Sequence, residues 1–409
     1  MDSAIKTKLA FSEQHEARTV QSYSFQLHQG LQGLQAVLPL WTALVNGMAS
    51  GSHFYQSPQW YRAFLDNTDQ PDSIFWFVIA SAGEKVVAVF PLQYERFSVA
   101  GLEVRLLGNI EDDQLQLVDF VFDRTMEYAG VLAAFLRWLY GQKTLRWDAL
   151  RLRRIAENSS VYYAIAREAP RFTQVTQYDS SGQFDVSVDY AHATVAMSGT
   201  AKRNLRRLYR RAEQSAPLRL ERVDTPERLP VALDHFFAVE ASGWKGGQGA
   251  NSAILCNPTL VRFFRELAAT FGKTRQCVIA LLWHGDEVVA VEFCLLIDRT
   301  LNVLKVGYRE TAQSFAPGNQ LLDLMIHHTC TDPGIDVLSL VNDPPWAHIF
   351  KPARLGVFAY FIPNNTLRGI LNLVALRLKR VNAPMFASRR GRTTALRRSR
   401  PPAQAEAET

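Results

Sequence analysis

Two parts of the chain repeat one succession of apolar and polar positions. A polar residue followed by proline opens an apolar segment, a short apolar run follows, and then a glycine with an acidic neighbour precedes an alternating Val/Ala run. Four pairs of segments carry the repeat: 57–64 with 257–264, 78–80 with 278–280, 83–89 with 285–291, and 147–152 with 335–340. Because the four pairs keep one order at a separation of about 200 residues, too long for a solenoid, they predict a duplicated domain.

Each copy predicts the same series of elements. A helix begins at Pro58 or Pro258, since Ser-Pro and Asn-Pro are typical helix starts. Two strands joined by a tight turn at Gly83 or Gly285 follow. The series then continues with a strand, an apolar helix and a further strand: 102–107, 126–140 and 149–152 in the first half, and 301–306, 320–330 and 337–341 in the second.

This series predicts an α/β fold in which two tandem domains each have a mixed, mostly antiparallel sheet flanked by helices. We place the first domain at residues 1–185 and the second at 186–365. With 409 residues, each half is long enough to bury its own core. Residues 366–409 are predicted to form a basic helix and a disordered tail, because the tail is charged and contains proline.

The composition predicts a soluble protein. Apolar residues make up 47% and charged residues 21% of the chain, and no apolar run reaches the length of a membrane span. The first twenty residues lack the apolar run of a secretory signal, so we expect a cytoplasmic location. The four cysteines have no metal-ligand spacing, and we expect no metal.

Positive charge is concentrated in two segments. Six basic residues lie between 202 and 211 and nine between 377 and 400; without these fifteen, the net charge of +6 becomes −9. This uneven distribution favours local anion contacts over a surface that coats nucleic acid, and we expect no DNA partner. The C-terminal basic helix is a candidate for contact with a membrane surface.

A loop of small residues in the second half runs directly into a helix. The free N–H groups of a helix's first turn, with the helix dipole behind them, form an anion site, and Pro-Gly lets the backbone approach a ligand closely. We therefore expect a pyrophosphate to bind at Ala316, Pro317, Gly318, Asn319 and Gln320. The first half lacks this loop.

The second half resembles the GNAT acyltransferases. The resemblance lies in the order of strand, glycine-bearing loop, helix and strand, followed by Ala-x-x-Phe-Lys-x-x-x-Leu-Gly over residues 347–356. Two such halves are similar to the Fem-type aminoacyltransferases and their CelD-like relatives; residues 54–64, 240–254 and 316–322 are similar to the CelD-like branch. The resemblance, which covers about residues 50–362, implies an acyl-CoA co-substrate such as acetyl-CoA, or aminoacyl-tRNA as in the Fem-type enzymes.

Four residues are candidates for the chemistry. Lys351 could stabilise an oxyanion, as its Phe-Lys is similar to that of the Fem-type enzymes. Glu240 and Asp343 are alternative general bases, the second at the carboxyl end of a strand where open sheets bind ligands. Tyr308, which closes its strand beside the loop, could donate a proton to the leaving group.

Further residues are candidates for substrate binding. The basic helix contributes Arg203 and Arg206, which we expect to contact a phosphate-bearing substrate or donor. Trp244 and Lys245 precede a two-glycine stretch that could fold over a site, and Trp346 follows the last strand before the Phe-Lys.

The combined prediction is an N-acyltransferase, with acetyl transfer expected, that acts on an amine or hydroxyl of a small-molecule, saccharide or envelope-precursor acceptor. The acceptor would bind in the cleft between the halves, while the first half shapes the cleft and performs no chemistry. An aminoacyl-tRNA-dependent transferase and a non-catalytic module that binds RNA or another polyanion are the alternatives.

Overall fold

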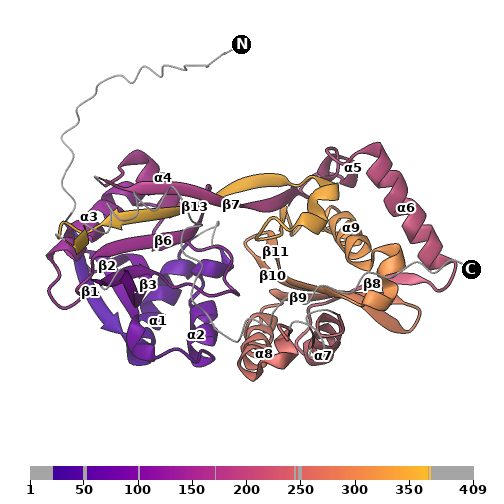
Figure 1. Ribbon diagram of the computed structural model, residues 1–409, viewed down its shortest axis with the longest axis horizontal. Helices are drawn as coiled ribbons and strands as arrows, with labels where there is room; N and C mark the ends of the chain where they lie inside the picture. Colours follow the sequence, from indigo (N-terminus) through magenta and orange to yellow (C-terminus); the bar gives the residue numbers. More distant parts are fainter. Residues whose placement is uncertain are drawn as a thin grey trace, which may run out of the picture.

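In a computed structural model the two halves of the chain share one 13-stranded mixed sheet (Figure 1). The structure describes residues 22–48, 53–99, 102–170, 172–243, 246, 251–366 and 368–369. The strand order is β1-β2-β3-β4-β6-β13-β7-β12-β11-β10-β9-β8, and β5 pairs with β3. The mixed sheet flanked by helices confirms the predicted fold class.

In the first half the helices and strands have these bounds: β1 (Ser24–Gln29), α1 (Gly30–Asn46), η1 (Phe54–Gln56), α2 (Pro58–Asp66), η2 (Asp72–Ile74), β2 (Phe75–Ala82), β3 (Lys85–Val99), β4 (Leu102–Asn109), β5 (Val121–Phe122), α3 (Tyr128–Gly141), β6 (Ala149–Ala156), α4 (Ser160–Arg167) and β7 (Gln174–Asp185).

In the second half they are: α5 (Tyr190–Ala193), α6 (Gly199–Glu213), β8 (Leu218–Val223), α7 (Leu229–Glu240), η3 (Ile254–Cys256), α8 (Pro258–Gly272), β9 (Cys277–His284), β10 (Glu287–Ile297), β11 (Thr300–Tyr308), η4 (Glu310–Phe315), α9 (Pro317–Thr329), β12 (Val337–Ser339), η5 (Pro345–Phe350) and β13 (Ala353–Pro363).

The repeated sequence segments form repeated elements. Helices α2 and α8 both begin at the expected proline, and the side chains of Ser57 and Asn257 accept hydrogen bonds from first-turn N–H groups. The turns between the paired strands have Gly83 and Gly285 at φ of +61° and +60°, a conformation that favours glycine. The duplicated unit read from the sequence is therefore present in the fold.

The two halves are joined by an exchange of strands. Strand β13, from the C-terminal part of the chain, pairs antiparallel with β6 of the first half and with β7. Strand β7 in turn pairs with β12 of the second half. The predicted boundary at residue 185 coincides with the last residue of β7, and the sheet crosses it without interruption.

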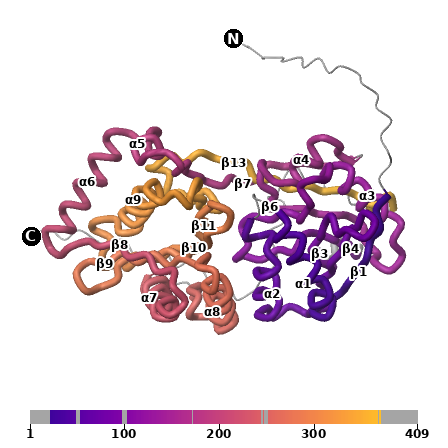
Figure 2. The backbone as a smooth tube through the Cα atoms, turned by 180° about the vertical axis from the view of Figure 1, so that it is seen from behind, coloured from indigo at the N-terminus to yellow at the C-terminus, as the bar shows by residue number. Residues whose placement is uncertain are grey.

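The halves also pack against each other on one face of the sheet. Helices α1 and α2 of the first half and α7 and α8 of the second contribute to one hydrophobic cluster. At the contact, the rings of Trp60 and Phe263 meet edge to face with centroids 5.1 Å apart. Helices α3 and α4 and helices α6 and α9 cover the other face in separate clusters. Figure 2 shows the two halves side by side.

The predicted basic helix and disordered tail lie outside the described residues, apart from 366 and 368–369. Within the described part of the chain, no helix is long and apolar enough to cross a membrane.

Candidate active site

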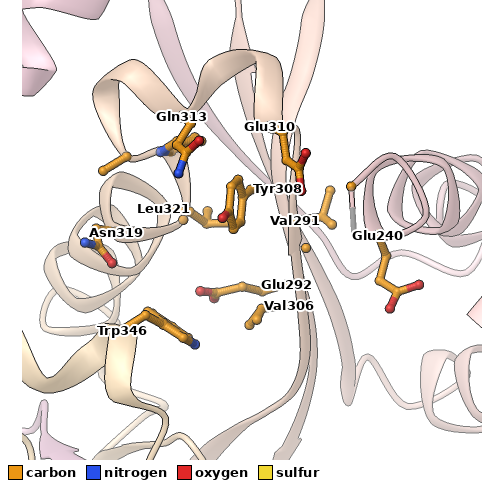
Figure 3. A pocket seen from close by; sticks show the side chains of 15 residues that line it. Glu240, Val291, Glu292, Val306, Tyr308, Glu310, Gln313, Asn319, Leu321 and Trp346 are labelled. Atoms are coloured by element: carbon orange, nitrogen blue, oxygen red, sulfur yellow. The ribbon is translucent and has the colours of Figure 1, made fainter. Parts of the chain in front are cut away.

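A cavity of about 490 Å³ lies where β10 and β11 meet the start of α9. Its walls come from the middle of β10, the end of β11, the end of α7, helices η4 and α9, and Trp346 of η5 (Figure 3). Three glutamates border it: Glu240, Glu292 and Glu310. Seven of the candidate residues from the sequence line this cavity: Glu240, Tyr308, Ala316, Pro317, Gly318, Asn319 and Trp346.

Glu292 is the buried carboxylate of this cavity. Its side chain is 1% exposed, and its Oε2 atom has no hydrogen-bond partner among the residues that the structure describes. Burial raises the pKa of Glu292 to about 8, because the charged form loses its hydration. Figure 3 shows its carboxylate directed into the cavity between Asn319 and Trp346. A carboxyl group with these properties can exchange a proton with a bound ligand near neutral pH.

The sequence contained a signal for Glu292 that its interpretation missed. The strand Glu287–Ile297 is apolar from Val288 to Ile297 except for this one carboxylate. A charged residue in the middle of a buried strand is rare unless it is paired or functional. The repeated Val-Val-Ala-Val is typical of a scaffold strand, and the buried carboxylate follows it directly.

The start of α9 forms one wall of the cavity. Ala316 has φ +54° and ψ +60°, and it ends η4 and begins α9 without a side-chain cap. Pro317 occupies the first turn. The N–H groups of Gly318 and Asn319 follow it, and because first-turn N–H groups have no acceptor within the helix, they can donate to a ligand. A Cβ atom at Gly318 would meet nothing closer than Tyr308 Cδ1 at 3.8 Å, an ordinary van der Waals contact, so the position has room for a small side chain.

Close packing behind the cavity fixes the position of Tyr308. At the preceding residue, Gly307, a Cβ atom would lie 2.7 Å from Cα of Glu240, so only glycine lets the end of α7 approach β11 this closely. Tyr308, the last residue of β11, is 37% exposed at the cavity wall. Its hydroxyl is thereby held beside the start of α9.

Strands β11 and β12 diverge next to the cavity. They pair in parallel over three residues only, Thr300 to Asn302 with Val337 to Ser339. Beyond this point a second hollow of about 170 Å³ lies between the two strands. Val306 and Trp346 border both hollows. The two hollows are therefore neighbours, separated by these two side chains.

The corresponding place in the first half is filled. Strands β4 and β6 also pair over three residues, but Val118 then forms a parallel bridge with Ile155, and its N–H donates to the Arg154 carbonyl at 2.8 Å. At the start of α3, the carboxylate of Glu127 lies beside Gly130 and forms an ion pair with Arg167 at 3.1 Å. That the first half performs no chemistry stays a prediction.

Glu240 and Asp343, the two expected bases, are engaged in hydrogen bonds. Glu240 is 5% exposed, and its Oε2 accepts the Ile254 N–H at 2.9 Å; Figure 3 shows its carboxylate directed away from the cavity. Asp343 is bound by Ser180, His348 and Arg354, each at 2.8 Å. Partial burial acts to raise the pKa of Asp343, but these three contacts leave it below its ordinary value.

Other expected site residues lie away from the cavity. Lys351 is exposed after η5 and does not line it. Arg203 and Arg206 are on the exposed face of α6. Gln320 is buried, and its side chain donates to the Leu205 carbonyl at 3.1 Å, which holds α6 against α9. Trp244 and Lys245 lie outside the described residues.

Within the ranges described, no group of three or more histidine, cysteine or acidic side chains could hold a metal ion.

Comparison with known proteins identifies the second half. Residues 199–345 match the family described as Acetyltransferase (GNAT) domain. No curated protein sequence matches the chain.

Among solved structures, FemX is similar over 83% of this chain and 96% of its own length, with a TM-score of 0.51 at 9% identity. A tandem GNAT protein from the clavulanic acid biosynthesis pathway covers 84% of this chain and 99% of its own, with a TM-score of 0.43 at 9% identity. The C-terminal domain of a putative lysylphosphatidylglycerol synthetase from Agrobacterium fabrum covers 85% and 97%, with a TM-score of 0.49 at 11% identity.

The match to residues 199–345 includes the buried Glu292, the divergent strands and the start of α9. The expected resemblance is confirmed in the half that carries the cavity, and the fold is similar to that of FemX over 83% of the chain. Residues 199–345 are therefore a GNAT-type domain, in a chain whose fold is similar to that of FemX.

Proposed function

We propose that the protein transfers an acyl group, with acetyl as the expected group, from acyl-CoA to an amine of a small-molecule, saccharide or envelope-precursor acceptor. The observation that carries this proposal is the unpartnered buried carboxylate of Glu292, which faces the first turn of α9 across the cavity. The carboxylate of Glu292 can take a proton from the attacking amine, and the first turn of α9 can bind the anionic pyrophosphate of the acyl donor.

The donor is assigned to the side of α9. The N–H groups of Gly318 and Asn319 would bind the pyrophosphate, as phosphates bind at helix starts elsewhere. The extended arm of the donor would reach the cavity through the divergence of β11 and β12, past Trp346.

The transfer step follows from the residues around the cavity. The acceptor nitrogen attacks the thioester carbonyl carbon, and the carboxylate of Glu292 takes a proton from that nitrogen. The C–S bond then breaks, and the thiolate takes a proton from the Tyr308 hydroxyl or from water. We assign the base to Glu292, and not to Glu240 or Asp343, because the latter two already accept hydrogen bonds from protein groups.

The donor assignment is tested by calorimetry with acetyl-CoA on the wild type, Gly318→Glu and Gly318→Ala. The alanine variant is the matched control, because a Cβ fits at this position without a clash. We expect wild-type affinity with alanine and at least a tenfold loss with glutamate, whose charge would lie at the first turn of α9. Absence of heat in the wild type, or equal affinity in all three proteins, would refute the assignment.

An aminoacyl-tRNA donor is the second candidate, and the fold shared with FemX favours it. If the wild type fails to bind acetyl-CoA but transfers a labelled aminoacyl group from tRNA, this second candidate replaces the first.

A further inference from the structure

Helix α6 carries a basic face that the proposed reaction does not use. Its apolar side packs inward through Leu205 and Ala212, which are buried. Figures 1 and 2 show the helix along the outer rim of the second half. The opposite side presents six cations: Lys202, Arg203, Arg206, Arg207, Arg210 and Arg211.

None of these six cations has an acidic partner within 4 Å in the described part of the chain. Arg203 and Arg207 donate only to the neighbouring side chains of Thr200 and Asn204. Elsewhere in the molecule exposed arginines are commonly paired, as Arg275 is with Asp224 and Arg299 with Asp336. The like charges on α6 are neighbours at i,i+3 and i,i+4 and repel one another, and a bound external anion would relieve this repulsion. Within the molecule, Asp323 of α9 attracts Lys202 and Arg206 over a longer distance.

The spacing of the cations favours an extended partner. They form three adjacent pairs, 202/203, 206/207 and 210/211, which recur every four residues, or about 6 Å along the helix axis. At about 100° between neighbouring residues they cover half of the helix circumference. A single pyrophosphate could meet only one of these pairs. The partner therefore carries many anionic groups over at least the length of the helix.

The chemistry of the face favours a planar partner. Tyr209 is the one aromatic residue of α6, and it is partly buried against the core cluster, so the face lacks the exposed stacking groups on which single-stranded nucleic acids bind. Double-stranded RNA is a poorer partner, because its A-form major groove is too narrow for protein side chains to read. The exposed helix α6, on the outer rim of the protein, would find no base edges to contact there. A bilayer with anionic headgroups offers dense negative charge to such a convex edge.

We propose that the basic face of α6 docks the protein on a membrane surface that carries anionic lipids. The contact is electrostatic and reversible, because the face has no large apolar side chain that could enter the bilayer. Without the six cations of α6 and the nine basic residues between 377 and 400, the rest of the chain has a net charge of −9, which the same surface repels. The two effects together orient the molecule with α6 toward the lipid.

The proposal predicts a measurable loss of vesicle binding. A basic residue near an anionic membrane contributes a factor of about five to the binding constant. Replacing three cations, in Arg203→Gln/Arg207→Gln/Arg210→Gln, is expected to weaken binding about 100-fold. The matched control is Arg62→Gln/Arg137→Gln/Arg262→Gln, which removes three exposed arginines from other helices and gives the same change in net charge.

The experiment is co-sedimentation of the full chain with phosphatidylcholine vesicles that contain 0 or 30% phosphatidylglycerol, at low and high salt. Support requires binding to the anionic vesicles only, its loss in the α6 variant, and its retention in the control. Equal binding of the α6 variant and the wild type would overturn the proposal, and so would equal losses in both variants.

Two competition arms identify the source of the anionic groups. Inorganic phosphate at 10 mM is expected to leave the protein on the vesicles, because isolated phosphates cannot span the three pairs. If a duplex or single-stranded RNA displaces the protein at a lower phosphate concentration than the vesicles provide, the partner is a nucleic acid and the membrane proposal fails. None of these outcomes depends on the acyl donor, so a failure here leaves the proposed reaction standing.

Discussion

Replacing Glu292 by glutamine is expected to stabilise the protein at neutral and alkaline pH while it abolishes acyl transfer. In the wild type the buried carboxyl holds its proton up to a pH of about 8. The unfolded chain releases that proton near its ordinary pKa of 4.5. Unfolding therefore releases a proton throughout this window, and the free energy of unfolding falls as the pH rises from 4.5 to about 8. Above the upper value the contribution is constant.

The size of this effect follows from the pKa difference. Each unit between the two values corresponds to about 1.4 kcal/mol. Between pH 5 and pH 8, where most of the window lies, the wild type is expected to lose about 3 to 4 kcal/mol that the glutamine variant keeps. Asp119, whose pKa burial raises to about 7, titrates in both proteins, so their difference reports on Glu292 alone.

Urea unfolding of the wild type and Glu292→Gln at pH 5, 7 and 8 measures this difference directly. Glu287→Gln is the matched control, because it changes an exposed glutamate of the same strand and should keep the wild-type pH dependence. Equal losses of stability in the wild type and Glu292→Gln would show that the carboxylate is not desolvated. A glutamine variant that transfers the acyl group at the wild-type rate would remove Glu292 from the mechanism.

Three further predictions follow from the same residues. The kcat/KM of acyl transfer should rise about tenfold per pH unit up to a pH of about 8 and then level off, since ionised Glu292 is the base; a flat profile between pH 6 and 8 would contradict this. Gly307→Ala should lower the free energy of unfolding by about 1 to 3 kcal/mol in thermal or urea denaturation, because its Cβ would clash with Glu240, whereas Gly318→Ala should have little effect. Asp343→Asn should lower the free energy of unfolding by about 1 to 3 kcal/mol at pH 7. The difference from the wild type should shrink as the pH falls toward 3, because the pKa of Asp343 is lowered in the folded protein and protonation of its carboxylate removes the ion pairs. An unchanged difference at pH 3 would refute the pairing.

Much of the fold could be read from the sequence because its signals are local. The Ser-Pro and Asn-Pro pairs begin helices by capping and by the fixed φ of proline, and Gly83 and Gly285 adopt the turn conformation that they favour. The cavity wall at Pro317 and Gly318 was also predicted, since a loop of small residues before a helix depends on neighbouring residues only.

The features that sequence reasoning missed depend on contacts between distant segments. Glu292 has a functional environment only because β9, β11 and α9 bury it together, which its own strand does not reveal. In the sequence Asp343 follows a strand with no visible partner, whereas in the structure Ser180, 163 residues away, donates a hydrogen bond to its carboxylate. The exchange of β7 and β13 likewise has no local signal, because both strands pair with distant partners.

This exchange of strands bears on how the protein acquires its structure during synthesis. Strand β6 leaves the ribosome long before β13, with which it pairs at Ala156 and Val357. Until residue 363 has emerged, the facing edges of β6 and β7 lack the strand that lies between them in the finished sheet. Uncovered strand edges are sites of aggregation, and pairings of such long sequence separation form slowly. We therefore expect the first half to need protection by chaperones until translation of β13 is complete, and chains that terminate before residue 353 to aggregate and not to yield a stable first domain.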